Sequence, residues 1–154
     1  MNDHPSNPKP RNNGAENKTS LFSGLLGWIR GVGGAQNGED SVRDALEEDG
    51  AGRVLVIAGG GSTRCALVGG NLGQMADDNG WAGILVDGCV RDVGELRGTT
   101  IGIRARGSSP RRSVKRGAGE RDVQVRIGEV DVSPGMWLWA DEDGIVLSDR
   151  NLEG

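Results

Sequence analysis

Two adjacent side chains with complementary chemistry, Arg91 and Asp92, follow a strongly apolar segment and a short glycine-containing turn. The apolar segment, residues 84–86, predicts a buried strand. Side chains at the carboxyl end of such a strand are held by the sheet yet open to solvent, and α/β proteins commonly bind ligands there. An arginine offers a planar fork to a carboxylate, and an aspartate offers hard oxygen to a divalent cation. The pair therefore predicts a site for an oxo-acid chelated by a metal ion.

Plainer interpretations of this pair remain open at the level of sequence. Arg91 and Asp92 could form an ordinary surface ion pair, or Asp92 could cap a helix. Asp87, which precedes Gly88, could point into the same site, although a turn formed by this Asp-Gly pair is the simpler interpretation.

A second candidate element is Gly69-Gly70-Asn71-Leu72, which lies directly before a predicted helix. Glycine leaves backbone amides unhindered, and amides at the start of a helix can hold a carboxylate or an enolate oxygen. We therefore expect this segment to bind an anionic part of a substrate.

A further glycine run, Gly59-Gly60-Gly61 followed by Ser62, has weaker support as a phosphate-binding loop. A Walker loop ends in Gly-Lys-Ser/Thr, and a dinucleotide fingerprint would need glycine where Arg64 stands. A tight turn between a strand and a helix is the favoured interpretation.

Histidine and cysteine usage excludes several kinds of catalytic site. The one histidine, His4, lies in a polar segment, so a Ser-His-Asp triad, a Cys-His nucleophile and a histidine-rich zinc site are excluded. Cys65 and Cys89 lack Cys-x-x-Cys spacing, so we interpret both as small buried hydrophobes. Acid-base chemistry is left to carboxylates, lysine or water activated by a metal ion.

Composition predicts one domain of a soluble, cytoplasmic protein. The 154 residues fit a single core, and 28 glycines with one Phe and no Tyr leave little aromatic bulk, so we expect the fold to gain stability by oligomerising. The formal net charge of −4 gives no general drive toward DNA, RNA or an anionic membrane. No signal peptide and no apolar run of about 20 residues is recognised. The local basic cluster of Arg111, Arg112, Lys115 and Arg116 is interpreted as a solvated loop, with a contact to a neighbouring subunit or to RNA as the alternative.

The hydrophobic pattern predicts a layered α/β sandwich. Residues 1–20 are predicted to be a disordered polar tail and residues 21–154 a single domain, in which residues 21–34 form either an interfacial helix or a poorly formed strand. Ser41, Ser62 and Asn71 are predicted to cap three short helices. Strands are predicted at residues 53–58, 84–86, 101–105, 123–127, 130–132, 136–140 and 145–147, with a mobile loop over residues 108–120.

The order and spacing of these blocks resemble the RraA-like family, which unites 4-hydroxy-4-methyl-2-oxoglutarate aldolases with the regulator of ribonuclease activity A. The resemblance runs from Ser41 to Ser148. It rests on the blocks at residues 54–57, 59–62, 64–67, 70–72, 80–92, 101–105, 138–141 and 144–148.

The resemblance implies a β/β/α swivelling-domain sandwich and a homotrimer with its sites at subunit boundaries. It also implies that the backbone of Gly70, Asn71 and Leu72 binds the pyruvoyl unit of a small oxo-acid substrate. Arg91 would bind the carboxylate or oxo group of that substrate. Asp92 would hold Mg²⁺ or Mn²⁺, which would stabilise an enolate as a Lewis acid.

The first hypothesis is therefore a metal-dependent class II aldolase that releases pyruvate, with oxaloacetate decarboxylation as a side activity. The alternative is a regulator that binds and inhibits a ribonuclease E-like enzyme without chemistry, and a third interpretation is a family member with neither activity. Gly70 and Ala58 stand where many relatives carry aspartate, and the family's usual N-terminal helix and strand are not recognisable. We therefore expect a slow enzyme that Gly70→Asp would improve.

Overall fold

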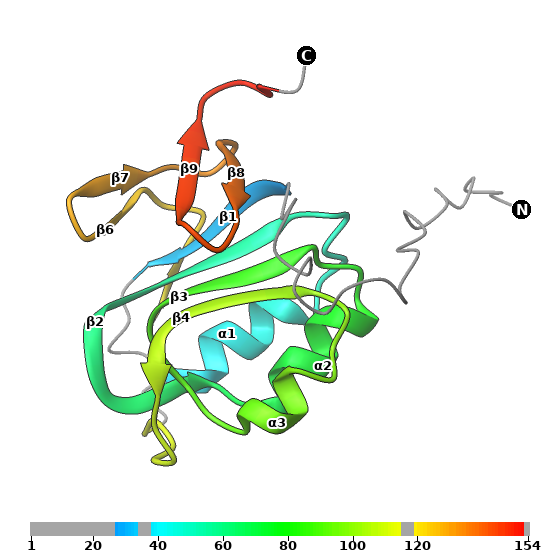
Figure 1. Ribbon diagram of the computed structural model, residues 1–154, viewed down its shortest axis with the longest axis vertical. Coiled ribbons are helices and arrows are strands. Elements are labelled where there is room, and N and C mark those ends of the chain that lie inside the picture. The colour runs from blue at the N-terminus through cyan, green and yellow to red at the C-terminus, as the bar shows by residue number, and fades with distance from the viewer. Residues whose placement is uncertain (1–26, 34–37, 115–118, 153–154) are drawn as a thin grey trace, which may run out of the picture.

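The computed structural model describes residues 27–33, 38–114 and 119–152 (Figure 1). The helices are α1 (Gly38–Leu46), α2 (Gly70–Asp78) and α3 (Val93–Leu96). The strands are β1 (Gly27–Gly33), β2 (Val54–Val68), β3 (Gly83–Val90), β4 (Gly102–Ser108), β5 (Glu120–Arg121), β6 (Val125–Ile127), β7 (Val130–Val132), β8 (Trp137–Ala140) and β9 (Ile145–Ser148).

The main sheet is mixed, with strand order β4-β3-β2-β1-β8-β9 and β5 beside β1. Strands β1 to β4 pair in parallel, and α1, α2 and α3 form the connections between them. Strand β8 returns antiparallel to β1 and forms a hairpin with β9, while β6 and β7 form a separate hairpin. The first half of the chain therefore brings the carboxyl ends of β2, β3 and β4 to one edge of the sheet.

Two apolar clusters cover the two faces of this sheet. Leu55 and Ile57 of β2 pack with the helices, while Val54 and Val56 of the same strand pack with β6, β7 and β8. Figure 1 shows the three helices together below the sheet and the β6–β7 hairpin above it. A central strand with both faces covered needs an unbroken apolar run, which is what residues 54–57 supply. The predicted layered β/β/α sandwich is confirmed.

The predicted strands are confirmed in position, and β1 shows that residues 27–33 form a strand and not a helix. The residues of the predicted polar tail, including His4, lie outside the described residues, as do Lys115 and Arg116. No helix in the described ranges has the length and hydropathy that crossing a membrane would require.

The helix predicted at residues 62–68 is wrong, because β2 continues through them to Val68. Gly60 and Gly61 have φ of 59° and 69°, and the pairing with β3 shifts register beyond Ile57. Positive φ values produce a bulge that bends a strand without ending it. Hydrogen bonds from β3 then decide the structure of the second half of β2.

Two predicted helix caps are also wrong. Helix α1 begins at Gly38, so Ser41 lies inside it, and the N-cap of α2 is Gly69. Asn71 therefore lies in the first turn of α2. The apolar faces are as predicted, because Val42, Ala45 and Leu46 of α1 are buried.

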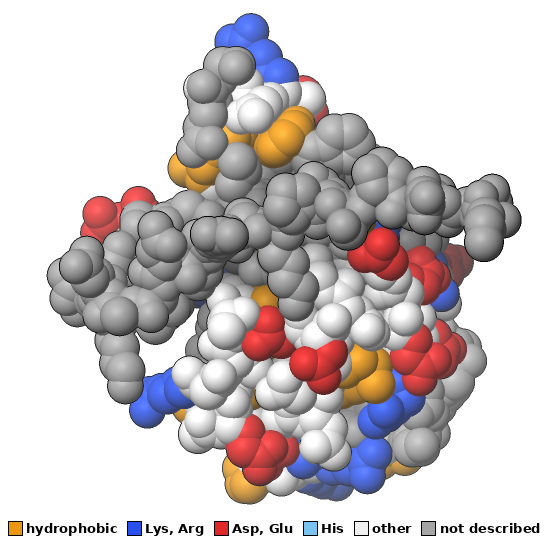
Figure 2. Space-filling model, turned by 90° about the vertical axis from the view of Figure 1, so that its right-hand side faces the viewer, with side chains coloured by type: hydrophobic (Ala, Val, Ile, Leu, Met, Phe, Trp, Pro, Cys, Tyr) orange, Lys and Arg blue, Asp and Glu red, His pale blue; other side chains and the backbone are white. Residues whose placement is uncertain are grey.

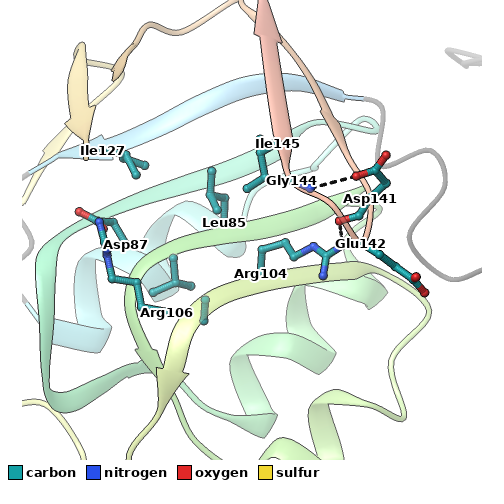
Figure 3. Close-up of a pocket in the computed structure, with 11 residues that line it drawn as sticks. Leu85, Asp87, Arg104, Arg106, Ile127, Asp141, Glu142, Gly144 and Ile145 are labelled. Carbon is teal, nitrogen blue, oxygen red and sulfur yellow. Dashed lines mark hydrogen bonds and ion pairs between the residues drawn. The ribbon is translucent and has the colours of Figure 1, made fainter. Parts of the chain in front are cut away.

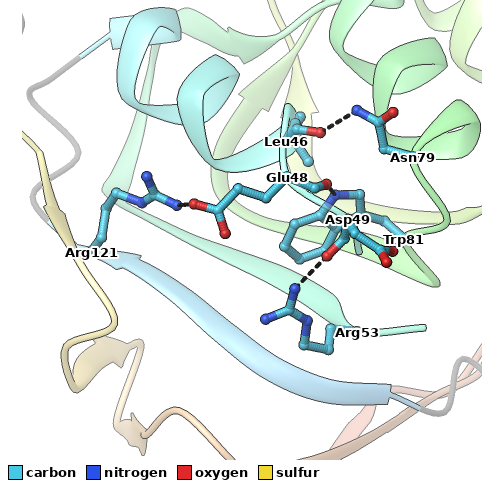
Figure 4. Close-up of polar contacts among 7 residues, drawn as sticks. All are labelled: Leu46, Glu48, Asp49, Arg53, Asn79, Trp81 and Arg121. Atoms are coloured by element: carbon cyan, nitrogen blue, oxygen red, sulfur yellow. Dashed lines mark hydrogen bonds and ion pairs between the residues drawn. The ribbon is translucent and has the colours of Figure 1, made fainter. Parts of the chain in front are cut away.

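The carboxyl end of α1 is fixed by side chains from three other parts of the chain (Figure 4). Asn79 Nδ2 donates to the Leu46 carbonyl at 2.7 Å, and Trp81 Nε1 donates to the Glu48 carbonyl at 3.2 Å. Arg53 lies over the Trp81 ring, 5.2 Å from its centroid, and donates to the Gly50 carbonyl at 2.8 Å. The bond to Leu46 satisfies a carbonyl group that the end of the helix leaves without a partner, and the bonds to Glu48 and Gly50 fix the turn that follows.

The contact between Gly50 and Trp81 generates the first prediction. A methyl group at Gly50 would overlap the Trp81 backbone, which cannot move without breaking these bonds. Gly50→Ala should therefore destabilise the protein by about 1–3 kcal/mol, as overpacking usually does, in a urea unfolding titration. Gly144→Ala is the matched control, because nothing lies within 4 Å of its added carbon. Equal unfolding free energies for the two variants would contradict the packing described here.

Candidate active site

The carboxyl end of β3 is held in place from both sides. The Arg91 amide donates to the Val68 carbonyl of β2 at 2.9 Å, and the Ser109 amide, just after β4, donates to the Val90 carbonyl at 2.9 Å. All eight residues of β3 are buried. The backbone that carries Arg91 and Asp92 is therefore fixed by its two neighbouring strands.

Asp92 has a strained backbone and an unusual set of partners. Its φ of 55° and ψ of 45° are in the left-handed region, which costs a non-glycine residue about 1–2 kcal/mol. It occupies the N-cap position of α3, yet its side chain makes no capping hydrogen bond. Instead Oδ2 accepts from the Gly70 amide at 3.1 Å and from Arg91 Nη1 at 2.7 Å. The carboxylate is thus directed at the start of α2 and does not cap its own helix.

The Arg91–Asp92 ion pair lies partly open to solvent, with side chains 25% and 35% exposed. The second carboxylate oxygen of Asp92, Oδ1, accepts no hydrogen bond from the described residues. The surface ion pair considered from sequence does exist, and it lies against the glycine segment that begins α2.

The two glycines at the start of α2 leave space for charged side chains. A carbon added at Gly69 would lie 2.7 Å from Arg91 Cζ, and one added at Gly70 would overlap the Glu95 carboxylate. The φ of Gly69 is −115°, which any residue can adopt, so conformation is not the reason for glycine there. The structure therefore brings Arg91, Asp92 and Glu95 together against Gly69 and Gly70.

Backbone amides in this segment are not equally available. The Gly70 amide is bonded to Asp92, and the Leu72 amide donates to the Gly69 carbonyl at 3.1 Å. The Asn71 amide has no hydrogen-bond acceptor among the described residues, and its side chain is exposed. Leu72 itself is buried in the core. Of the predicted substrate-binding amides, that of Asn71 is the one available at the helix start.

Glu95 was missed by the sequence analysis. It lies on α3, three residues after Asp92, and residues at this spacing in a helical turn lie on the same side. The Asp-x-x-Glu spacing was the signal that could have identified it. An aspartate followed by a second carboxylate one helical turn later indicates a cation site more specifically than Arg91-Asp92 alone.

This arrangement suits a magnesium-type cation. Mg²⁺ in proteins is typically held by one or two carboxylates, with the remaining positions taken by substrate and water. Asp92 and Glu95 provide such a pair next to Gly70. No group of three or more His, Cys, Asp or Glu side chains within the described ranges could hold a metal ion, so the residues do not match a closed, four-ligand zinc site.

Asp87 does not belong to this site, and the turn predicted for Asp87-Gly88 is wrong. Both residues lie within β3, and Asp87 is 3% exposed. Its carboxylate accepts from the Gly61 amide at 3.1 Å and pairs with Arg106 of β4. Figure 3 shows Asp87 and Arg106 in a separate hollow, which neither Arg91 nor Asp92 lines.

The basic segment after β4 is held to the sheet over part of its length. The Ala66 amide of β2 donates to the Arg111 carbonyl at 2.7 Å, and the Ser113 amide donates to the Ala66 carbonyl at 3.2 Å. The predicted mobile loop is therefore wrong for residues 111–113, which pair with β2.

Comparisons with a family model and with individual relatives agree with one another. The RraA-like family model, described as Aldolase/RraA, matches residues 9–147. A Burkholderia multivorans (strain ATCC 17616 / 249) protein named "Putative 4-hydroxy-4-methyl-2-oxoglutarate aldolase" is 59% identical over 111 residues, which are 72% of this chain and 68% of that protein. An Arabidopsis thaliana protein, numbered 3 under the same name, is 58% identical over 72% of this chain and 67% of its own length.

A solved structure of the same family also matches this fold. The structure titled as the RNA-processing inhibitor RraA from Thermus thermophilis superposes with a TM-score of 0.80 at 43% identity. The match covers 87% of this chain and 82% of that one.

The close approach of Gly70 and Glu95 generates the second prediction. Gly70→Ala should lower the free energy of unfolding by about 1–3 kcal/mol, because the added methyl group forces the Glu95 side chain aside. Combining it with Glu95→Ala should recover part of that loss in a double-mutant cycle measured by urea unfolding. An aspartate side chain at residue 70 would also meet the Glu95 carboxylate. Contrary to the expectation from sequence, Gly70→Asp should therefore not raise activity.

Gly94→Ala is the control for this cycle, since its added carbon meets nothing within 4 Å. If Gly70→Ala costs no more stability than Gly94→Ala, the close approach of Glu95 to Gly70 is wrong.

Proposed function

This chain belongs to the RraA-like family, and on that basis we propose that it is a divalent-metal-dependent lyase that cleaves 4-hydroxy-4-methyl-2-oxoglutarate-type substrates to pyruvate. The observation that carries the proposal is the convergence of Arg91, Asp92 and Glu95 on Gly69 and Gly70. These groups combine a carboxylate receptor with a two-carboxylate cation site, which is what the chemistry of a 2-oxo acid needs.

Arg91 would bind the carboxylate of the pyruvoyl unit. Its guanidinium rests against Gly69 and its Nη1 is bonded to Asp92, so the planar fork is oriented before substrate arrives. Orientation in advance lowers the entropic cost of binding and sets the position of the 2-oxo group.

Asp92 and Glu95 would hold the divalent cation, through Asp92 Oδ1 and the Glu95 carboxylate. When bound, this cation would supply Lewis-acid stabilisation of negative charge on the 2-oxo oxygen. The left-handed backbone of Asp92 turns its carboxylate toward the start of α2, where the Gly70 amide binds Oδ2. Strain of this kind persists where surrounding bonds over-determine it, which is common in functional sites.

The Asn71 amide would stabilise the negative charge that develops during cleavage. A water molecule in the site would take the proton of the 4-hydroxyl group as the bond between carbons 3 and 4 breaks. The electron pair of that bond passes to the enolate of one pyruvate, which then takes a proton at carbon 3. The second product carries the new carbonyl group, so this substrate gives two molecules of pyruvate. A backbone N–H at a helix N-terminus is a preorganised donor for such an oxygen.

The same site accounts for an expected side activity on oxaloacetate. Decarboxylation of this substrate also leaves the electron pair on the enolate of pyruvate, so the groups that stabilise one enolate stabilise the other. The assay for both reactions is pyruvate release with Mg²⁺ or Mn²⁺, with and without chelator.

The second candidate function is binding and inhibition of a ribonuclease E-like enzyme without chemistry. The likeness to the protein titled RNA-processing inhibitor RraA, at 43% identity, is the observation in its favour. Pyruvate release that is abolished by chelator supports the lyase. Ribonuclease inhibition by a protein that releases no pyruvate from either substrate supports the regulator. In either case we propose the homotrimer that the family implies, which sedimentation would test.

The third prediction concerns Asp92. Asp92→Ala should lower magnesium-dependent pyruvate release by about a hundredfold or more, because it removes a cation ligand and the partner of Arg91. Thermal unfolding should change little, since a partly exposed carboxylate contributes little to packing. Asp44→Ala, which removes an exposed carboxylate of α1, should leave activity unchanged. Parent-like activity in Asp92→Ala would exclude Asp92 from the site.

The fourth prediction concerns Arg91. Arg91→Lys keeps the charge but loses the planar fork, so kcat/KM for the oxo-acid should fall about 10- to 100-fold. Arg97→Lys is the control, because Arg97 is an exposed arginine at the end of α3. Steady-state kinetics that are the same for both variants would show that Arg91 does not bind the carboxylate.

A further inference from the structure

A second hollow, with a volume of about 300 Å³, lies on the face of the sheet opposite the helices (Figure 3). Its floor is the β3–β4 edge of the sheet, and its walls come from β6 and from the turn between β8 and β9. Leu85, Ile127 and Ile145 supply apolar surface, and Arg106 supplies a guanidinium group. The volume is at the lower end of the range for small-molecule sites.

Arg106 is oriented by a buried carboxylate that the proposed lyase site does not use. Asp87 Oδ1 pairs with Arg106 Nε, and Asp87 Oδ2 accepts the Gly61 amide at 3.1 Å. A carbon added at Gly61 would lie 3.4 Å from Arg106 Nε, so the guanidinium lies close along the glycine bend of β2. The Gly61 amide thus holds one oxygen of Asp87, and the other oxygen of Asp87 orients Arg106.

The outer edge of the Arg106 guanidinium is available for binding. Its side chain is 47% exposed, and neither terminal nitrogen donates a hydrogen bond to any residue in the described ranges. Because Nε is taken by Asp87, the two Nη groups remain, and they form the end-on fork that receives a carboxylate through two parallel hydrogen bonds.

The far rim of the hollow limits what else a ligand can carry. Figure 3 shows Asp141 and Glu142 on the side away from Arg106. Arg104 lies between these two residues and Arg106, and it donates a hydrogen bond to the Asp141 carbonyl. Two carboxylates against the one guanidinium of Arg104 leave this rim with net negative charge, which disfavours a second carboxylate on the ligand.

We propose that this hollow binds a small aliphatic monocarboxylate. The ligand's carboxylate is held by the Nη groups of Arg106, and its hydrocarbon body packs on Leu85, Ile127 and Ile145. This site is separate from the lyase site and does not depend on it, since the two share no residue. Its selectivity is also opposite, because the lyase substrate is a dicarboxylate.

The test is isothermal titration of the full chain with 3-methylbutanoate, for which we expect a dissociation constant on the order of 1 mM. The neutral isostere 3-methylbutanamide and the dicarboxylate glutarate should bind at least tenfold more weakly. Arg106→Gln should weaken 3-methylbutanoate binding about tenfold or more, while Arg97→Gln, an equal loss of charge elsewhere, should not. Arg91→Gln should also leave this binding intact, which separates the two sites.

Ile145→Glu is the second variant, in case loss of the Asp87 partner unfolds Arg106→Gln. It places a negative charge on an exposed apolar wall and should weaken binding without affecting the fold. The proposal is overturned if the parent shows no saturable binding at millimolar ligand or if Arg106→Gln and Ile145→Glu, both folded, bind as the parent does. It is also overturned if binding is lost in Arg91→Gln. A change of sedimentation coefficient in Arg106→Gln would overturn it too, by showing that a carboxylate of a second copy fills the fork.

Discussion

The hydrogen bond from the Gly70 amide to Asp92 is the interaction on which the geometry of the candidate active site depends. It joins the start of α2 to the turn after β3, and it holds Asp92 in a backbone conformation that this residue would otherwise leave. Residues 69 and 70 have no side chains, and a carbon added at either would meet Arg91 or Glu95. Arg91 and Glu95 then lie in the space that side chains at these positions would fill. This backbone contact therefore lies within a cluster of three charged groups, Arg91, Asp92 and Glu95.

The two apolar clusters explain why this contact can persist. Strands β2 and β3 are covered on both faces, so the ends of both strands are fixed relative to the helices. Burial of these strands also places the Asp87 carboxylate away from water, which is unfavourable for a charged group. A carboxylate in the middle of a buried strand needs partners, and Arg106 and Gly61 provide them on the face opposite α2 and α3. The chain thus presents charged groups on both faces of the same parallel sheet, in different surroundings.

Much of the fold could be predicted from the sequence, because residues 54–57 and 84–86 are apolar runs of a length that suits buried parallel strands. The strand-end argument placed Arg91 and Asp92 at the edge of the sheet, and the family resemblance implied that the segment from Gly69 to Leu72 shares a site with them. Local patterns failed where distant hydrogen bonds decide the structure. Strand β2 continues past three glycines because β3 pairs with it, and nothing within residues 62–68 encodes that partner. The role of Glu95 required knowing that Asp92 begins a helical turn.

Strand β4 forms one end of the main sheet, and on its outer side it pairs with no other strand in the described ranges. Open strand edges are templates for uncontrolled sheet growth between molecules. The sequence Gly-Ile-Arg-Ala-Arg-Gly-Ser opposes that growth, because Arg104 and Arg106 would bring like charges together if two such edges met. Arg106, which we assign to ligand binding, therefore also opposes aggregation through this strand edge. Replacing it with an apolar residue would weaken both ligand binding and resistance to aggregation.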